Sequence, residues 1–524
     1  MDDTSPPPTR TPWFLSWPVL AFLFCLPGVL WSLASPLFSA PDEPSHAVKA
    51  VALWHGQVGG DDSMRDDGYL TTIYEIPAVW AQASSFRQCF AFQPDITADC
   101  SPPFAGSESI SGADSTAGHY PPSFYALVGW GGRASAGPTG LYLMRITNAI
   151  ACGLLLTMGV RALFRIIEPR LALVGVLVAV TPMVSFLTGA VNPNGIEICA
   201  AIAVWCTLLA ILRIGDGAAP IPRVLAVQFA VAAAVVATVR PLSPLFLGAI
   251  GLLALSSASM ATLRHVLRDR SVQVAAAVVV VVAALATLSI LSSDIFAAVP
   301  GRIGVGSTNP GLVIVGETDG YIAEMIGVFG WLDTRSPAYT LYAWLAATFG
   351  LLALGLTTGS RRAAGSLLAV VGATLLLPVA AQYPGATTQG LAWQGRYTLP
   401  IAVGIPILAV VVLGDRRRER SADPAAPATG RPATGRPSIG RLAIGVAVLA
   451  TSASVAAFFW TLRRYTTGAT GSLRITTGAW QPPAGSLTLV LAMAAVAVAT
   501  VAVVIGARPT RAEPAPRSAD HLAG

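Results

Sequence analysis

Repeated apolar runs constrain this chain more than any other feature of its sequence. Many of them extend for about 20 residues with few or no charges, which is the length of helix that crosses the hydrocarbon core of a bilayer. Only 11% of the 524 residues are charged and 54% are hydrophobic, whereas soluble domains carry about 25% charged residues. This composition excludes an ordinary soluble enzyme, a disordered chain and a collagen-like repeat. It predicts an all-α, multi-pass integral membrane protein.

Arginine-bearing gaps separate the apolar runs and predict about twelve transmembrane helices. The first run lacks a small-residue cleavage site, so we interpret it as a retained span and not as a signal peptide. The predicted spans lie near residues 13–38, 139–160, 171–191, 195–212, 224–239, 242–263, 272–293, 337–359, 364–383, 397–414, 442–462 and 485–507.

The distribution of charge favours one orientation of these spans. With the N-terminus inside, the cytoplasmic segments carry a net charge of +11 and the exterior segments −5, which together give the formal charge of +6. This asymmetry satisfies the positive-inside rule. We therefore expect a plasma-membrane protein with both termini in the cytoplasm and the lipid bilayer as its surroundings. Because the basic residues lie in gaps between spans and not on one soluble face, nucleic acid is not an expected partner.

The gaps between the runs also define the expected organisation of the chain. The large first exterior loop is expected to carry surface helices, and the Arg/Pro-rich segment near the end to be a disordered, basic cytoplasmic linker. The expected parts are a cytoplasmic tail at 1–12, a membrane domain at 13–414 with exterior loops at 39–138 and 294–336, the linker at 415–441, two last transmembrane helices at 442–507, and a disordered cytoplasmic tail at 508–524.

Two of the six cysteines, Cys89 and Cys100, lie close together in the first exterior loop. The predicted topology places this loop in an oxidising compartment, which favours a local disulfide over two free thiols. The other four cysteines fall in predicted spans, where we expect small apolar packing residues.

The segment Ala-Pro-Asp-Glu-Pro-Ser-His-Ala-Val-Lys at 40–49 follows the first span directly. Asp42 suits a helix N-cap, with Glu43 in the first turn, and spacing by three places Glu43, His46 and Lys49 near one helix face. Acid, imidazole and ammonium groups together could deprotonate an acceptor hydroxyl and hold a phosphate or a divalent cation. A capping box with a solvated face explains the same residues, and spacing alone leaves both interpretations open.

An Asp-Glu pair just outside the first span, with a histidine soon after, resembles the first-loop motif of GT-C glycosyltransferases, including protein O-mannosyltransferases. The fuller pattern Pro-Asp-Glu-Pro-x-His resembles a family of multi-pass bacterial membrane proteins, common in actinobacteria, that is catalogued as a domain of unknown function. Further matches to that family are His119-Tyr120-Pro121-Pro122, Asn192-Pro193-Asn194-Gly195, residues 327–333, Gln394-Gly395-Arg396-Tyr397, Arg463-Arg464-Tyr465 and Trp480-Gln481-Pro482-Pro483. They extend from residue 40 to 483, so the resemblance covers nearly the whole chain.

The resemblance implies a GT-C-like fold and a mechanism. GT-C enzymes take a sugar from a polyprenyl-phosphate donor and transfer it to an acceptor on the exterior face, with the first-loop acid as general base or metal ligand. Carried onto this chain, Asp42 is the candidate base and Glu43 a second acid, and the two could hold a divalent cation, Mg²⁺ or Mn²⁺. Pro44 stands where some O-mannosyltransferases have another residue.

The donor phosphate requires cationic partners at the depth of the acids. Arg396 is the first candidate, and a snorkelling arginine at the membrane rim is the alternative for it. Tyr120 and Asn192 also have structural explanations, as the entry to a surface helix and as an exterior turn. The expected substrate-binding residues are His46, Lys49, Tyr120, Asn192, Asn194, Arg396, Arg463 and Arg464.

The leading hypothesis is a GT-C-like glycosyltransferase that acts on an envelope glycan or lipid acceptor. A transporter or flippase of envelope precursors and a non-catalytic envelope-assembly protein are the alternatives. Coupled transporters usually carry ionisable residues near the membrane midplane, whereas Arg145 and Glu197 are the nearest candidates here and lie toward exterior helix ends. The enzyme hypothesis requires Asp42, Glu43, His46, Arg396 and Asn192 to converge within one cavity at the exterior membrane boundary.

Overall fold

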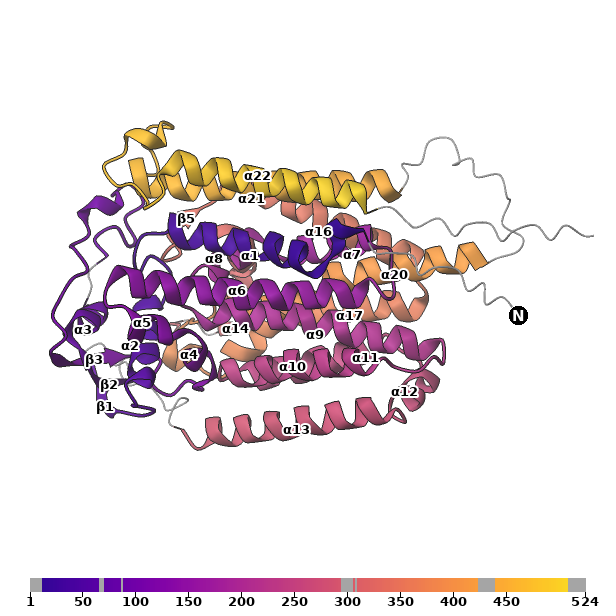
Figure 1. Cartoon of the computed structure of the whole chain (residues 1–524). Helices are drawn as coiled ribbons and strands as arrows, with labels where there is room; N and C mark the ends of the chain where they lie inside the picture. Colours follow the sequence, from indigo (N-terminus) through magenta and orange to yellow (C-terminus); the bar gives the residue numbers. More distant parts are fainter. Residues whose placement is uncertain are drawn as a thin grey trace, which may run out of the picture.

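The computed structural model describes residues 12–65, 70–85, 88–293, 305–306, 309–422 and 439–507. It is a bundle of long helices lying side by side, with a group of short helices and strands gathered at one end (Figure 1). We call this end of the bundle the loop end. The predicted N-terminal tail up to residue 11, the C-terminal tail, most of the 415–441 linker and residues 294–304 and 307–308 of the second exterior loop lie outside the described residues.

Within the described ranges, nine helices are long and apolar enough to cross a membrane, which confirms the predicted multi-pass helical class. A tenth candidate span is the pair α7 (Pro169–Ala179) and α8 (Pro182–Thr188), which meet at 76°. The nine are α1 (Trp17–Ala34), α6 (Pro138–Leu163), α9 (Pro193–Asp216), α13 (Arg270–Leu291), α16 (Ala338–Thr358), α17 (Arg361–Gln382), α19 (Leu399–Ala402) continued by α20 (Gly404–Ala422), α21 (Ile439–Thr467) and α22 (Ser486–Gly506).

The remaining predicted spans are shorter or broken. α10 (Arg223–Val239) and α11 (Ser243–Leu255) extend about 25 Å and 20 Å, less than the roughly 30 Å of a hydrocarbon core. The predicted span at 242–263 breaks before α12 (Met260–Val266), because the Ser259 hydroxyl caps a new helix there. The span at 171–191 breaks where Thr181 caps α8 and Pro182 takes its first position.

The loop end holds short helices and also strands, which an all-α prediction did not include. The antiparallel sheet β1-β2-β3 packs against α2 and α3, and burial alternates along most of β2, as a strand with one covered face requires. The helices of this end are α2 (Glu43–Trp54), α3 (Ala78–Ser85), α4 (Ser123–Val128), α5 (Trp130–Ala134), α14 (Pro310–Gly316), α15 (Thr318–Gly327) and α18 (Ala386–Gln389). The strands are β1 (Asp61–Met64), β2 (Leu70–Pro77), β3 (Ile110–Ser115) and the pair β4 (Val328–Phe329) and β5 (Thr334–Arg335). Short 3₁₀ turns are η1 (Trp13–Leu15), η2 (Ala98–Cys100), η4 (Gly395–Tyr397) and η5 (Ile475–Thr477).

α9 forms the centre of the bundle, because it is the most deeply buried of the nine spans and packs on α6, α10 and α20. α13 lies at the edge, packed mainly on α10, and leaves most of its surface open to lipid (Figure 1). α20 and α21 continue into the predicted linker at both ends, so residues 415–422 and 439–441 are helical.

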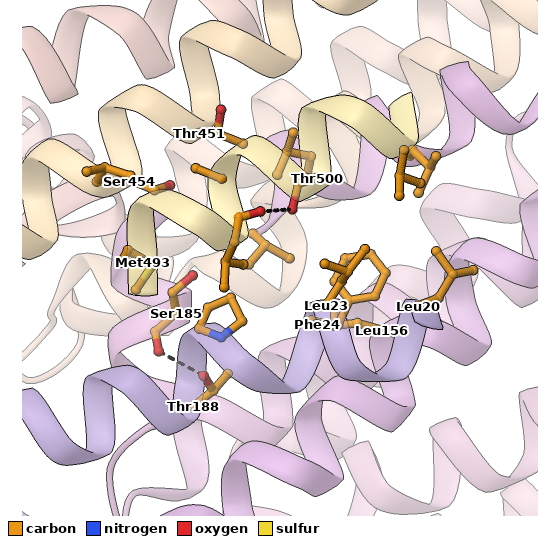
Figure 2. A pocket seen from close by; sticks show the side chains of 18 of the residues that line it. Leu20, Leu23, Phe24, Leu156, Ser185, Thr188, Thr451, Ser454, Met493 and Thr500 are labelled. Carbon is orange, nitrogen blue, oxygen red and sulfur yellow. Dashed lines mark hydrogen bonds between the residues drawn. The ribbon is translucent and has the colours of Figure 1, made fainter. Parts of the chain in front are cut away.

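An apolar pocket of about 80 Å³ lies among α1, α6, α7, α8, α21 and α22, and no ionisable side chain lines it. Figure 2 shows the hydroxyl groups around it. Those of Thr188, Thr451 and Thr500 donate to backbone carbonyls of their own helices at 2.8 Å. The pocket surface is mainly apolar, with a few hydroxyl oxygens as its polar groups.

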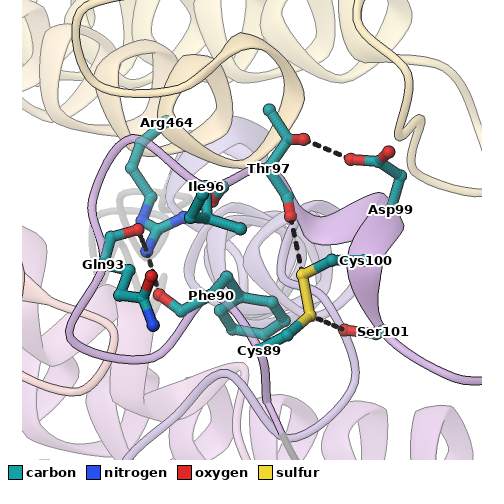
Figure 3. Close-up of a disulfide and its surroundings, with 9 residues drawn as sticks. All are labelled: Cys89, Phe90, Gln93, Ile96, Thr97, Asp99, Cys100, Ser101 and Arg464. Carbon is teal, nitrogen blue, oxygen red and sulfur yellow. Dashed lines mark hydrogen bonds between the residues drawn. A yellow bond between two sulfur atoms is a disulfide. The ribbon is translucent and has the colours of Figure 1, made fainter.

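The structure contains the predicted disulfide between Cys89 and Cys100, whose Cα atoms are 6.0 Å apart. Arg464 of α21 binds the closed loop: its guanidinium donates to the carbonyls of Phe90 at 2.6 Å and Ile96 at 2.7 Å (Figure 3). The disulfide therefore holds the 89–100 loop in a conformation in which its carbonyls bind the buried Arg464.

We predict that replacing both cysteines, Cys89→Ser with Cys100→Ser, lowers the stability of the loop end. Closing a loop of 11 residues is worth about 2–3 kcal/mol in the chain-entropy account. Thermal unfolding in detergent should show a lower Tm for the double variant, and reductant should lower the Tm of the wild type toward it. Reductant should leave the double variant unchanged, and an identical Tm for both proteins would contradict a stabilising bridge.

Candidate functional site

Asp42 lies at the loop end, at the N-cap position of α2, in the left-handed conformation with φ of 60°. Aspartate tolerates this conformation better than most residues. Its side chain makes no capping hydrogen bond to α2. Instead, Oδ2 accepts from Nη2 of Arg396 at 2.9 Å, and 47% of the side chain stays exposed. The capping-box interpretation is therefore not what the structure shows for Asp42.

Arg396 lies in η4, directly before α19, and only 1% of its side chain is exposed. This burial excludes the snorkelling interpretation, in which the charged head would extend into water. The Glu324 carboxylate accepts from the backbone N–H of Gly395 at 2.6 Å and so fixes the turn. Gly395 is required there, because an added Cβ would lie 2.1 Å from the carbonyl oxygen of Tyr321.

A second buried arginine, Arg240, lies beside Arg396 at the end of α10. Its Nη1 donates to Glu197 Oε2 at 2.9 Å, and the Ser243 hydroxyl donates to the other carboxylate oxygen. The guanidinium carbons of Arg240 and Arg396 lie 4.7 Å and 5.1 Å from the centre of the Tyr397 ring. Both cations are therefore held at one aromatic side chain.

Three guanidinium N–H groups of this pair are buried without a hydrogen-bond partner: Nε and Nη1 of Arg396 and Nε of Arg240. An unpaired buried donor on a charged group is costly, so these groups favour an acceptor that the protein itself does not provide. Arginine donors in this arrangement suit the oxygens of a phosphate. Tyr120 completes this cluster: burial raises the pKa of its hydroxyl, and the nearby charge of Arg240 opposes the rise. Asp42, Tyr120, Arg240, Arg396 and Tyr397 form what we call the arginine centre.

Glu43 is adjacent to Asp42 in sequence but binds a different arginine. Arg145 of α6 donates to its two oxygens at 2.7 Å and 2.6 Å, and the Val191 N–H donates to Oε1 at 2.9 Å. Both side chains are fully buried. The two acids therefore do not share a site, and they do not fit a divalent cation held between them. Within the described part of the chain, no three His, Cys, Asp or Glu side chains are arranged to hold a metal ion.

His46 and Lys49 lie on α2 near the arginine centre, each with its own protein partners. The His46 ring bonds the Tyr125 hydroxyl at 2.9 Å, and Lys49 donates to the carbonyls of Gly118 and of Tyr120, the latter at 2.7 Å. Burial and nearby cations lower the pKa of His46 well below its usual value, so the ring is neutral at pH 7. Burial also lowers the pKa of Lys49 to about 8. Both residues position the 118–125 segment around the centre.

Asn192 supports the turn that carries Asp42. Its Nδ2 donates to the carbonyl of Pro41 at 2.8 Å, and its Oδ1 accepts from the Asn194 N–H at 3.0 Å as the N-cap of α9. The predicted exterior turn is therefore a helix cap with Pro193 at the first position. The Oδ1 atom of Asn194 is buried without a hydrogen-bond partner.

Arg463 and Arg464 do not reach Asp42 by any contact found in the structure. Arg464 binds the disulfide loop and lies 3.3 Å from Asp333 in an ion pair. Arg463 donates to the carbonyl of Gly471 and lies over the Trp460 ring. Both were candidates for the donor phosphate, and the structure uses them to anchor loops.

The sequence prediction missed Arg240, Tyr397 and Glu324 as members or supports of the centre. A signal for Arg240 existed, because it is the sole charge in a very short exterior gap, where the positive-inside rule disfavours arginine. An arginine retained in such a gap indicates a local function. Glu324 had no such signal, since it belongs to an acidic loop segment that is usually solvated.

Comparison with known proteins gives one family and two solved structures. Residues 25–405 match DUF2142, described as a predicted membrane protein. No curated protein matches the chain. ArnT from Cupriavidus metallidurans in the apo state is similar with a TM-score of 0.43 and 15% identity, over 94% of this chain and 76% of that one. The arabinofuranosyltransferase AftD from Mycobacteria is similar with a TM-score of 0.38 and 16% identity, over 86% of this chain and 27% of that one. The chain thus spans about a quarter of AftD.

We predict that Glu43→Gln destabilises the protein, because it leaves the buried Arg145 charge without its carboxylate. Breaking one side of a buried ion pair costs about 3–5 kcal/mol. The Tm in detergent should fall, and the double variant Glu43→Gln with Arg145→Met should recover part of the loss. Glu75→Gln, which changes an exposed acid of β2, is the matched control. A Glu43→Gln protein as stable as this control would show that the pair is not structural.

Proposed function

We propose that this chain, which belongs to the DUF2142 family of predicted membrane proteins, is a GT-C-like glycosyltransferase. It transfers a sugar from a polyprenyl-phosphate donor to a cell-envelope acceptor on the outer face of the membrane. The observation that carries the proposal is the ion pair of the half-exposed Asp42 with the buried Arg396, beside guanidinium N–H groups that have no protein partner.

Asp42 takes the role of general base. Its carboxylate accepts the proton of the acceptor hydroxyl while that oxygen forms a bond to C1 of the donor sugar. The bond from C1 to the phosphate oxygen breaks, and the electron pair leaves with the polyprenyl phosphate. Attack opposite the leaving group inverts the configuration at C1. The exposed half of the Asp42 side chain gives the acceptor access to the base.

Arg396 and Arg240 bind the leaving phosphate. The charge on the phosphate increases as the bond to C1 breaks, so fixed cations in a water-poor site stabilise the transition state more than the ground state. Glu197 and Tyr397 hold the two guanidinium groups in place, and their cost of reorganisation is therefore small.

An apolar pocket of about 150 Å³ lies beneath Arg396 and supports a lipid-linked donor. Leu399 and Ala402, three and six residues after Arg396, line it together with residues of α15, α16 and α17. A prenyl chain in this pocket would place its phosphate at the arginine end. The polar head and apolar chain of one ligand would then meet matching surfaces.

The proposed orientation follows from charge. The loop end carries the disulfide, and the sequence places the excess of positive charge at the opposite end. We therefore propose that the arginine centre faces the outside of the plasma membrane and that both termini are cytoplasmic. Transport is favoured less, because the pocket inside the bundle has no ionisable lining residue.

We predict that Asp42→Asn leaves the protein folded and inserted but lowers the transfer rate by about 10²–10⁴-fold, the usual contribution of a general base. Transfer from radiolabelled decaprenyl-phosphate arabinose and mannose to an envelope extract would be measured in nanodiscs. Asp61→Asn, at an exposed aspartate of β1, is the control and should be unaffected. Wild-type transfer by a stable Asp42→Asn protein would overturn the assignment of the base.

Arg396→Lys and Arg240→Lys test the donor site while keeping each buried charge. Lysine cannot present the planar fork of donors, and each lost charge-assisted hydrogen bond costs about 1.5–3 kcal/mol. We expect KM for the donor to rise about 10–100-fold in both variants, with a smaller change in kcat. Arg133→Lys, at an exposed arginine of α5, should leave KM unchanged. If KM for the donor were also unchanged in Arg396→Lys and Arg240→Lys, the donor would bind elsewhere.

A further inference from the structure

A cleft of about 790 Å³ opens at the edge of the bundle between α13 and the short helices of the loop end. This cleft shares no lining residue with the pocket beneath Arg396. Its lining residues are Leu53, Trp54, Gly56, Val58, Pro121, Pro122, Ser123, Ala126, Thr238, Val282, Leu285, Ala286 and Ser289. Pockets of this volume commonly bind small-molecule ligands.

The cleft lies along α13, a candidate membrane span, near the end of that helix that adjoins the loop end. α13 contributes Val282, Leu285, Ala286 and Ser289, which share one helix face by their spacing and belong to the half nearer the loop end. None of the lining side chains is ionisable, and Ser123 already donates its hydroxyl to the carbonyl of Thr238. Trp54 lies at its rim, 44% exposed, as tryptophan does at membrane interfaces.

Three elements continue from the cleft to the arginine centre. Pro121 directly follows Tyr120, and Thr238 precedes Arg240 by two residues. Leu53 lies one helical turn beyond Lys49, which binds the carbonyl of Tyr120. An apolar chain in the cleft would therefore carry its polar head toward Tyr120 and Arg240. The pocket beneath Arg396 adjoins the same centre through Leu399, which follows Arg396 by three residues.

The centre thus has two apolar sites, whereas a single lipid-linked substrate requires one. Because Leu399 follows Arg396 by three residues, we assign the smaller pocket to the prenyl units next to the donor phosphate. This leaves the cleft beside Tyr120 and Arg240 for a second apolar chain. Resting on the proposed function, we propose that this cleft binds the hydrocarbon chain of the acceptor. The acceptor is then a hydroxyl-bearing membrane lipid and not a water-soluble glycan, and its hydroxyl proton passes to Asp42 in the transfer step.

The test uses the full-length protein in nanodiscs with two acceptor probes that differ only in chain length, octyl α-mannoside and methyl α-mannoside. The donors are decaprenyl-phosphate arabinose and mannose. The cleft should lower the KM of the octyl probe at least 10-fold below that of the methyl probe, because buried methylene groups are favourable. Ala286→Trp, which projects a large ring into the cleft, should remove this advantage. Ala284→Trp, at an exposed alanine of α13 outside the lining, should preserve it.

A binding measurement separates the inference from the proposed function. An octyl mannoside with a diazirine in its chain should label the 282–289 part of α13, and labelling should be lost in Ala286→Trp but not in Ala284→Trp. Labelling of this kind without any sugar transfer would overturn the proposed function and keep the amphiphile site. Transfer with equal KM for both probes would overturn the acceptor site and keep the enzyme. Labelling spread evenly along α13, and equal in both variants, would show ordinary annular lipid and overturn the inference.

Discussion

The pairing of buried arginines with carboxylates organises the loop end of this protein. Arg145 binds Glu43, Arg240 binds Glu197, and Arg396 binds Asp42, and each arginine side chain is at least 92% buried. A buried charge without its partner is strongly destabilising, so the two pairs in which both side chains are buried, Arg145–Glu43 and Arg240–Glu197, fix the segments that carry them. Together the pairs join α2, α6, α9, α10 and η4. The arginine centre forms where the second and third pairs meet at Tyr397.

Much of the membrane architecture could be predicted from the sequence, because burial in lipid demands long apolar runs. Asp42 and Arg396 could also be identified from the sequence, because each is a charged residue at the end of such a run. The directions in which neighbouring side chains point could not be predicted from the sequence. Asp42 and Glu43 bind arginines from segments more than 200 residues apart, and the choice depends on the left-handed backbone at Asp42. A spacing rule for an ordinary helix start does not reveal that conformation.

The breaks in predicted spans escaped the sequence analysis for a different reason. Hydropathy averages a window, so it does not register a single capping hydroxyl inside an apolar run. Thr181 and Ser259 each accept a hydrogen bond from a backbone N–H three residues later and start a new helix there. The strands of the loop end were missed because their covered face comes from α2 and α3, which are remote in sequence from β3. Local patterns cannot supply such partners.

The three acids differ in how much of each carboxylate remains available. Both oxygens of Glu43 and both oxygens of Glu197 accept hydrogen bonds, and neither side chain is exposed. Asp42 binds its arginine through Oδ2 and keeps half of its side chain exposed. A base must take a proton from a substrate, so of these three acids Asp42 alone has the access. Arg396 binds Asp42 through Nη2 and leaves Nε and Nη1 unpaired, so in the proposed mechanism the base and the phosphate would bind different nitrogens of one guanidinium. One side chain would then position both the base and the leaving group.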